Sequence, residues 1–152
     1  MDFQSNEILN SESFKCYAFW SGILVLKMVF MSVLTGLQRF RKKAFSNPED
    51  LILINQAQIK FDDDDVERAR RAHRNDLETI LPFLIIGYLY VLTKPNETAA
   101  CYLFRIAGIC RLIHTLVYSI IVVRQPARGI AFWGTTGIMI YMAVVVMVHF
   151  YS

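Results

Sequence analysis

The chain has 152 residues, 55% of them hydrophobic, and carries a formal net charge of +3. Its mean hydropathy of +0.37 is too high for an ordinary small soluble domain. Apolar stretches of about 20 residues span a bilayer as helices, and such stretches fill most of this chain, which excludes a separate soluble catalytic domain. We therefore predict an all-α integral membrane protein, a single domain over residues 1–152 built as a four-transmembrane-helix bundle.

The predicted spans follow one another with short connections, except for one polar loop at residues 39–65. The segment before the first span has no basic stretch and no small-residue cleavage site, so we expect that span to remain as an anchor and not to be removed as a signal peptide. The spans are residues 14–38, 66–93, 99–123 and 130–151.

Basic residues are concentrated in the first and third loops. Loops rich in Lys and Arg stay on the cytoplasmic side of a membrane. We therefore expect both loops to face the cytosol and both termini to lie on the other side. The basic residues are Arg39, Arg41, Lys42, Lys43 and Lys60 in the first loop, and Arg124 and Arg128 in the third.

An acidic run at residues 62–65 precedes the second span. Asp64 and Glu67 have the spacing of a capping box, and acidic side chains suit the positive end of a helix dipole. A calcium loop is the alternative, but the Gly and the spaced ligands that it needs are missing. The run therefore predicts the start of a helix.

Lys27 lies near the middle of the first span, too deep to reach either membrane surface easily. Asp76 of the second span lies at a compatible depth. We expect the two side chains to form a structural ion pair, with a role in ligand binding as the alternative.

The three cysteines, Cys16, Cys101 and Cys110, all lie in apolar spans and show no C-x-x-C spacing. Such cysteines usually behave as small packed hydrophobic residues. We therefore expect packed thiols here, without a disulfide or a metal site.

Three polar residues of the third span share a helix face because they stand at positions i, i+3 and i+7: Arg111, His114 and Tyr118. A charge at membrane depth is costly and usually marks a functional site. This face therefore indicates a binding site inside the membrane.

The start of the second span adds Arg71, Arg74, Asn75 and Glu78, with Arg74 and Glu78 spaced as an i, i+4 pair. Together with the third span, this segment leaves positive charge in excess near the cytoplasmic boundary, which favours an anionic ligand. Arginine suits carboxylates, and Glu78 could receive an ammonium group. A peptide-like metabolite such as glutathione fits these charges, and so does a phosphate-bearing lipid headgroup.

Several motifs spread over the whole chain resemble the MAPEG family, the membrane-associated proteins of eicosanoid and glutathione metabolism. Within that family the chain is most similar to the branch of the type 1 microsomal glutathione transferase and the microsomal prostaglandin E synthase. The motifs are RKKAFSNPED at 41–50, VER at 66–68, RAHRNDLE at 71–78, PF at 82–83, the run of Arg111, His114, Thr115 and Tyr118, and Pro126 with Arg128.

The resemblance implies a homotrimer of four-helix subunits with glutathione bound between neighbours near the cytoplasmic face. It places Arg128 beside the glutathione thiol and makes Tyr118 a possible hydrogen-bond donor to it, so these two are the candidate catalytic residues. Arg39 is expected to reach in from the adjacent subunit. The full set of glutathione-binding residues that it implies is Arg39, Arg74, Asn75, Glu78, His114, Tyr118 and Arg128. No metal is expected.

The implied activity is a glutathione transferase for hydrophobic electrophiles, with glutathione peroxidase activity toward lipid hydroperoxides. The alternatives are an isomerase of the prostaglandin E synthase type and a non-catalytic lipid-binding protein. The synthase pattern has Ser directly after the thiol-side Arg and Tyr further on, whereas this chain has Gly129 and Phe132. Leu51 stands where the mammalian transferase has a stress-sensing Cys. The expected location is the endoplasmic reticulum, or the mitochondrial outer membrane, with the site facing the cytosol.

Overall fold

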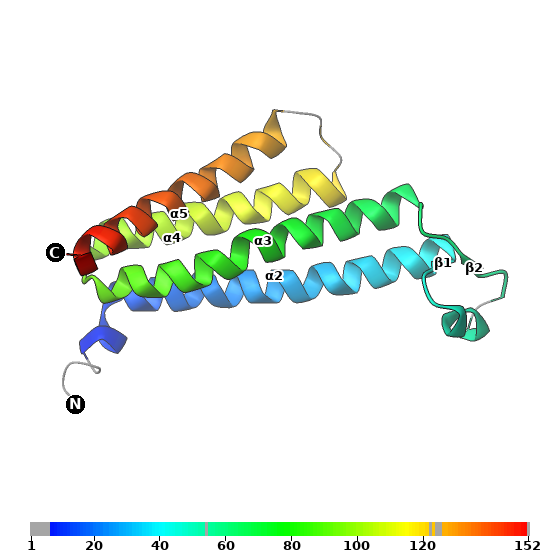
Figure 1. Cartoon of the computed structure of the whole chain (residues 1–152), viewed down its shortest axis with the longest axis horizontal. Helices are drawn as coiled ribbons and strands as arrows, with labels where there is room; N and C mark the ends of the chain where they lie inside the picture. The colour runs from blue at the N-terminus through cyan, green and yellow to red at the C-terminus, as the bar shows by residue number, and fades with distance from the viewer. Residues whose placement is uncertain (1–6, 54, 122, 124–125, 152) are drawn as a thin grey trace.

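A computed structural model describes residues 7–53, 55–121, 123 and 126–151 of the chain, and most of these are helical. Four of the described helices are long and apolar enough to cross a membrane, which confirms the predicted number of spans. They are α2 (Glu12–Lys42), α3 (Asp64–Leu92), α4 (Glu97–Thr115) and α5 (Ala127–Tyr151), and α4 continues into the π-helix η2 (Leu116–Ile120) (Figure 1).

The helices run alternately up and down the bundle (Figure 1). α2 packs against α3 and α4, and α5 packs against the same two helices. We call the end that holds Glu12, Glu97 and Tyr151 the terminal end, and the end that holds Lys42, Asp64 and Ala127 the loop end (Figure 1). The predicted basic loops thus share the loop end, although Arg124 itself lies outside the described residues.

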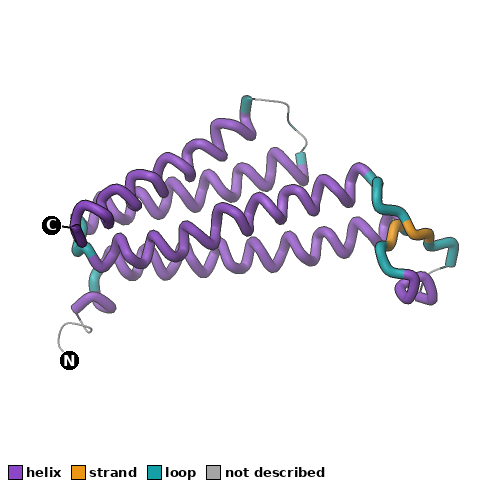
Figure 2. The backbone as a smooth tube through the Cα atoms, viewed as in Figure 1, coloured by secondary structure: helices purple, strands orange, loops and turns teal. Residues whose placement is uncertain are grey.

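The long loop folds against the loop end of α2 and α3. Its strands β1 (Ala44–Phe45) and β2 (Gln58–Ile59) pair in parallel, and the 3-10 helix η1 (Pro48–Leu53) lies between them (Figure 2). Ala44 and Phe45 are buried, so this small sheet anchors the loop to the bundle.

Asp63 caps the start of α3, one residue before the predicted cap, Asp64. Its carboxylate accepts hydrogen bonds from the backbone N–H groups of Asp65 and Val66 at 3.2 and 3.3 Å. Glu67 does not complete a capping box, because it stands four residues after this cap and not three, and its carboxylate pairs with Arg70 at 2.6 Å. Burial raises the pKa of Asp63, but the two backbone hydrogen bonds, with Lys60 and Lys42 nearby, outweigh this and lower it.

The core is rich in aromatic side chains that meet edge to face. Phe104 of α4 lies at its centre and contacts the rings of Tyr17, Phe83 and Tyr90 at centroid distances of 5.6, 6.1 and 6.3 Å. The outer faces of the helices expose many large hydrophobic side chains. In a spanning bundle these faces meet lipid, because a helix satisfies its own backbone hydrogen bonds there.

α2 and α4 approach closely through a ring packed on a glycine. The indole of Trp20 lies where a side chain at Gly108 would have to stand. Small residues allow membrane helices to come this close.

Cys16 of α2 and Cys101 of α4 form a disulfide at the terminal end, so the expectation of packed thiols was wrong for these two residues. Each stands about one turn into its helix, and the antiparallel path of α3 brings the two starts together with a Cα–Cα distance of 5.4 Å. A separation of 85 residues gives no local signal of such a pairing. Cys110 is the free cysteine.

Candidate functional site

A buried ion pair joins α2 to α3. Lys27 Nζ lies 2.5 Å from Asp76 Oδ1, and the two side chains are only 5% and 1% exposed. This confirms the structural pairing predicted for Lys27. Among the described residues, Arg111 is the other buried charged side chain, so this part of the interior holds two cations and one anion.

Arg111 connects α4 to both α3 and α5. Its Nη1 donates to Asn75 Oδ1 at 3.1 Å, and its Nε donates to Thr135 Oγ1 at 3.3 Å. Thr135 in turn donates to the carbonyl of Ala107. The guanidinium carbon also lies 5.6 Å from the centre of the Phe132 ring. Arg111 therefore fixes the side chain of Asn75, one of the predicted ligand-binding residues.

His114, Tyr118 and Arg128 form a stack at the loop end of α4 and α5. The rings of His114 and Tyr118 are stacked with centroids 5.6 Å apart, and the guanidinium carbon of Arg128 lies 5.0 Å from the centre of the Tyr118 ring. Tyr118 belongs to the π-helix, and such irregular turns are frequent at functional sites.

This stack borders a hollow of about 400 Å³. Its lining residues are His114, Tyr118, Arg128, Gly129, Phe132 and Trp133. Of the side chains that the structure describes here, His114 Nδ1 and Arg128 Nε are buried and have no hydrogen-bond partner. Buried polar groups normally have partners, so this wall of the hollow suits a ligand with hydrogen-bonding groups, including an acceptor for Arg128 Nε.

A second hollow, of about 540 Å³, lies between α2 and α3 and is strongly basic. Arg39 borders it and donates to Ser46 Oγ at 2.5 Å, which ties the end of α2 to the long loop. The lining includes four arginines and one acidic residue, Glu67, which is already paired with Arg70. The lining residues are Ser32, Thr35, Gly36, Arg39, Glu67, Arg70, Arg71, His73, Arg74 and Leu77.

One subunit does not gather all the predicted site residues into one cavity. Arg39 and Arg74 border the α2/α3 hollow, whereas the stack of His114, Tyr118 and Arg128 borders the α4/α5 hollow. Glu78 is exposed and borders neither of them. In the part of the chain that the structure describes, no ion pair joins Arg74 to Glu78, so the predicted i, i+4 pair is not formed.

The three residues predicted to share one face of the third span, Arg111, His114 and Tyr118, do not all line the same hollow. Arg111 turns to Asn75 and Thr135 and does not line the hollow that His114 and Tyr118 border. Thr135 and Trp133 were not predicted as part of the site. The sequence did contain a signal for Thr135, because a hydroxyl group in a very apolar helix usually forms a hydrogen bond to a neighbouring helix.

Comparison with known proteins adds an independent observation. The model of the MAPEG family matches residues 17–148. Microsomal glutathione S-transferase 1 of Sus scrofa is 40% identical over 141 residues, which cover 90% of each chain. The Homo sapiens protein of the same name is 38% identical with the same coverage. Prostaglandin E synthase of Bos taurus is 41% identical over 126 residues, covering 83% of this chain and 82% of its own. The chain therefore belongs to the MAPEG family.

Proposed function

We propose that this protein is a membrane-bound glutathione transferase that conjugates glutathione to hydrophobic electrophiles. The observation that carries the proposal is the set of cations and hydrogen-bonding side chains around the two hollows at the loop end. It is supported by the 40% identity, over 90% of the chain, to a protein named microsomal glutathione S-transferase 1.

The charged groups of glutathione match the charged and polar side chains at the loop end. Glutathione carries two carboxylates, one ammonium group and one thiol. Arg39 and Arg74 supply guanidinium groups for the carboxylates, since arginine binds carboxylates in a bidentate manner. The exposed Glu78 receives the ammonium group, and the amide of Asn75, held by Arg111, offers a further polar contact.

The site is completed between subunits of a homotrimer. Within one subunit Arg39 borders the α2/α3 hollow, whereas the stack borders the α4/α5 hollow, so a ligand held by the stack can receive Arg39 from a neighbouring chain. In our proposal Arg39 enters the site of the adjacent subunit, where it joins Arg74 and Glu78 and the stack of His114, Tyr118 and Arg128. Closed rings of identical subunits are formed by such heterologous contacts.

The chemistry requires the thiolate of glutathione. A free cysteine thiol has a pKa of about 8.5 and is mostly protonated at neutral pH. Arg128 stabilises the anion by its charge, and the hydroxyl of Tyr118 donates a hydrogen bond to the sulfur. The thiolate then attacks an electrophilic carbon, the carbon–sulfur bond forms, and the leaving group departs with its electron pair. The protein contributes positioning and electrostatic stabilisation.

The same thiolate can reduce lipid hydroperoxides. It attacks the outer oxygen of the peroxide, a second glutathione resolves the sulfenic product, and the balance is one alcohol, one water and one glutathione disulfide. The membrane supplies the apolar substrates and the cytosol supplies glutathione. We place the loop end in the cytosol, because the basic loops lie there, and the protein in the endoplasmic reticulum or the mitochondrial outer membrane.

An isomerase of the prostaglandin E synthase type is the second candidate, favoured by the 41% identity to a protein of that name. Two residues of the hollow argue against it. Gly129 and Phe132 stand where the synthase pattern has hydroxyl-bearing residues, and the ring of Phe132 packs against Arg111. A non-catalytic lipid-binding role is weaker, because it does not require Glu78 or the stack.

Three substrates given to the purified protein with glutathione separate these functions: 1-chloro-2,4-dinitrobenzene, a lipid hydroperoxide and a prostaglandin endoperoxide. We expect conjugation and peroxide reduction that both fall strongly in the Arg128→Leu variant. Turnover of the endoperoxide alone would establish the isomerase instead. Absence of all three activities in a protein that binds lipid would support the non-catalytic role.

A further inference from the structure

The disulfide lies at the end of the bundle opposite to the proposed glutathione site. Cys16 and Cys101 are at the terminal end, near the starts of α2 and α4, whereas His114, Tyr118 and Arg128 are at the loop end. The proposed orientation puts the terminal end away from the cytosol, on the side where compartments are oxidising and disulfides persist. The bond is therefore kept apart from cytosolic glutathione.

The bond is open to reagents from that side. Both cysteines are only half-buried. Cys101 borders a hollow of about 300 Å³ that is otherwise lined by Glu12, Glu97, Thr98, Tyr102 and Arg105. A buried structural disulfide lacks such an approach. Here a small molecule that enters the hollow reaches Cys101.

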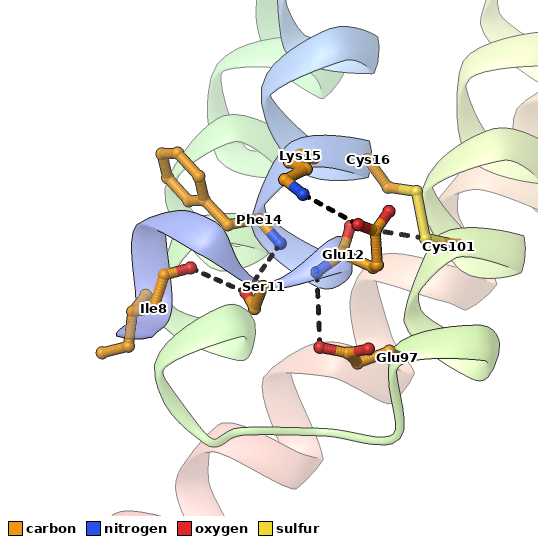
Figure 3. Close-up of polar contacts among 8 residues, drawn as sticks. All are labelled: Ile8, Ser11, Glu12, Phe14, Lys15, Cys16, Glu97 and Cys101. Atoms are coloured by element: carbon orange, nitrogen blue, oxygen red, sulfur yellow. Dashed lines mark hydrogen bonds and ion pairs between the residues drawn. A yellow bond between two sulfur atoms is a disulfide. The ribbon is translucent and has the colours of Figure 1, made fainter. Parts of the chain in front are cut away.

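The surroundings also suit the reduced form. The sulfur of Cys101 lies 3.5 Å from the carbonyl oxygen of Glu12 (Figure 3). A disulfide sulfur has no hydrogen to donate, but the thiol of reduced Cys101 would find its acceptor in place. The backbone N–H of Glu12 also donates to the carboxylate of Glu97 at 3.3 Å, so α2 and α4 remain linked when the sulfurs separate (Figure 3).

We propose that Cys16 and Cys101 form a reversible thiol-exchange site that reacts with small-molecule thiols in the compartment at the terminal end. A thiolate attacks the sulfur of Cys101, forming a mixed disulfide and releasing Cys16 as a thiolate that takes a proton from water. A second thiolate then attacks the mixed disulfide, leaving Cys101 reduced. The balance is two small thiols oxidised to their disulfide and one protein disulfide reduced to two thiols.

Reduction removes the covalent link between α2 and α4. The bond closes a loop of 85 residues, and links across long loops restrict the unfolded chain most. The oxidised protein is therefore the more heat-stable form, while the loop end keeps its own contacts in both states.

The first test counts free thiols. Protein purified without reductant is divided into two samples, and one of them is treated with 2-mercaptoethanol while it is still folded. Both samples are then denatured in N-ethylmaleimide, and the number of labels on each is measured by mass spectrometry. This thiol has no carboxylates, so it does not imitate glutathione at the proposed site. The three cysteines and the single bond predict one label before treatment and three after it. Exchange into 2-hydroxyethyl disulfide should restore one label.

The second test measures thermal stability. Reduction should lower the melting temperature of the wild type and of the matched control Cys110→Ser by about 5 °C or more. It should leave the Cys16→Ser/Cys101→Ser double variant unchanged. Three labels before treatment, a thiol-sensitive bond between two chains, or a bond that 2-mercaptoethanol reduces only after unfolding would each overturn the proposal. None of these readouts depends on transferase activity.

Discussion

Arg128 combines two features that suit a role in chemistry. Its guanidinium lies over the Tyr118 ring, and its Nε is buried without a hydrogen-bond partner among the described residues. We expect Arg128→Leu to abolish the ultraviolet absorbance of bound glutathione thiolate at neutral pH and to lower kcat and kcat/KM together, as the loss of a transition-state contact does.

Glutathione affinity should change much less in this variant, and raising the pH should restore part of the turnover because more thiolate then forms without help. Arg128→Lys is the matched control, since it keeps the positive charge but loses the planar set of guanidinium N–H donors. We expect its turnover to lie between those of the wild type and Arg128→Leu. Full turnover in Arg128→Leu would assign the stabilising cation to another residue, with Arg39 the first candidate.

Arg74 and Glu78 are exposed on α3 and are not paired with each other, so both are available to a ligand. Glutathione and a neighbouring subunit bury these side chains in our proposal, so we expect Arg74→Ala and Glu78→Ala each to weaken glutathione binding by roughly 2–5 kcal/mol, the usual cost of removing one partner of a buried charged contact. Titration calorimetry on the detergent-solubilised protein measures this. Arg105→Ala, which removes an exposed arginine at the terminal end, is the control and should bind normally. Unchanged affinity in both α3 variants would remove them from the site.

The pair of Lys27 and Asp76 acts between elements, because it fixes α2 against α3 in the interior. Asp76 is paired with Lys27 and also interacts electrostatically with Arg111, so removing Asp76 and removing Lys27 should not have the same effect. Lys27→Met leaves Asp76 with Arg111, whereas Asp76→Leu leaves two buried cations without an anion. We therefore expect Asp76→Leu to lower the melting temperature more than Lys27→Met does.

Removing one partner of a buried pair costs about 3–5 kcal/mol, whereas replacing both by apolar groups is often neutral. The Lys27→Met/Asp76→Leu double variant should therefore be more stable than Asp76→Leu alone. Thermal unfolding of the wild type, the two single variants and the double variant gives a complete double-mutant cycle. Purely additive losses would show that the two side chains do not act as a pair.

The contact of α2 with α4 depends on Gly108. A side chain there would enter the space of the Trp20 ring, so we expect Gly108→Val to cost about 1–3 kcal/mol, as overpacking does. Gly137→Val is the matched control, because a side chain at Gly137 of α5 would meet no atom within 4 Å. Thermal unfolding should separate the two variants, and Trp20→Ala should relieve much of the effect of Gly108→Val. Equal stability of both valine variants would contradict the close approach.

At the scale of the whole molecule, a site shared between subunits predicts complementation. Arg39→Leu and Arg128→Leu homo-oligomers should each have low activity. In trimers that contain both co-expressed chains, activity should return in about one third of the sites, because one of the three interfaces of such a ring pairs an intact Arg39 with an intact Arg128 of the neighbour. Tandem affinity tags isolate the mixed oligomers for assay. A mixture no more active than its parents would place both arginines in the site of a single subunit.

The sequence by itself determined the helices, the family and the central ion pair. Hydropathy over about 20 residues is a local property, so the four spans could be read directly. Lys27 and Asp76 could be paired because a charge in a spanning helix has few choices, and depth along each helix follows from residue number. The MAPEG motifs are likewise contiguous strings, and the family match over residues 17–148 confirmed them.

The tertiary structure decided which side chains meet. Cys16 and Cys101 are 85 residues apart and carry no motif, so only the packing of α2 on α4 revealed their bond. Helical periodicity put Arg111 on a face with His114 and Tyr118, but Asn75 and Thr135 on two other helices draw Arg111 away from the hollow. Periodicity gives the direction in which a side chain leaves its own helix. Its partners depend on the rotation and separation of the neighbouring helices, which are set by the packing of the whole bundle.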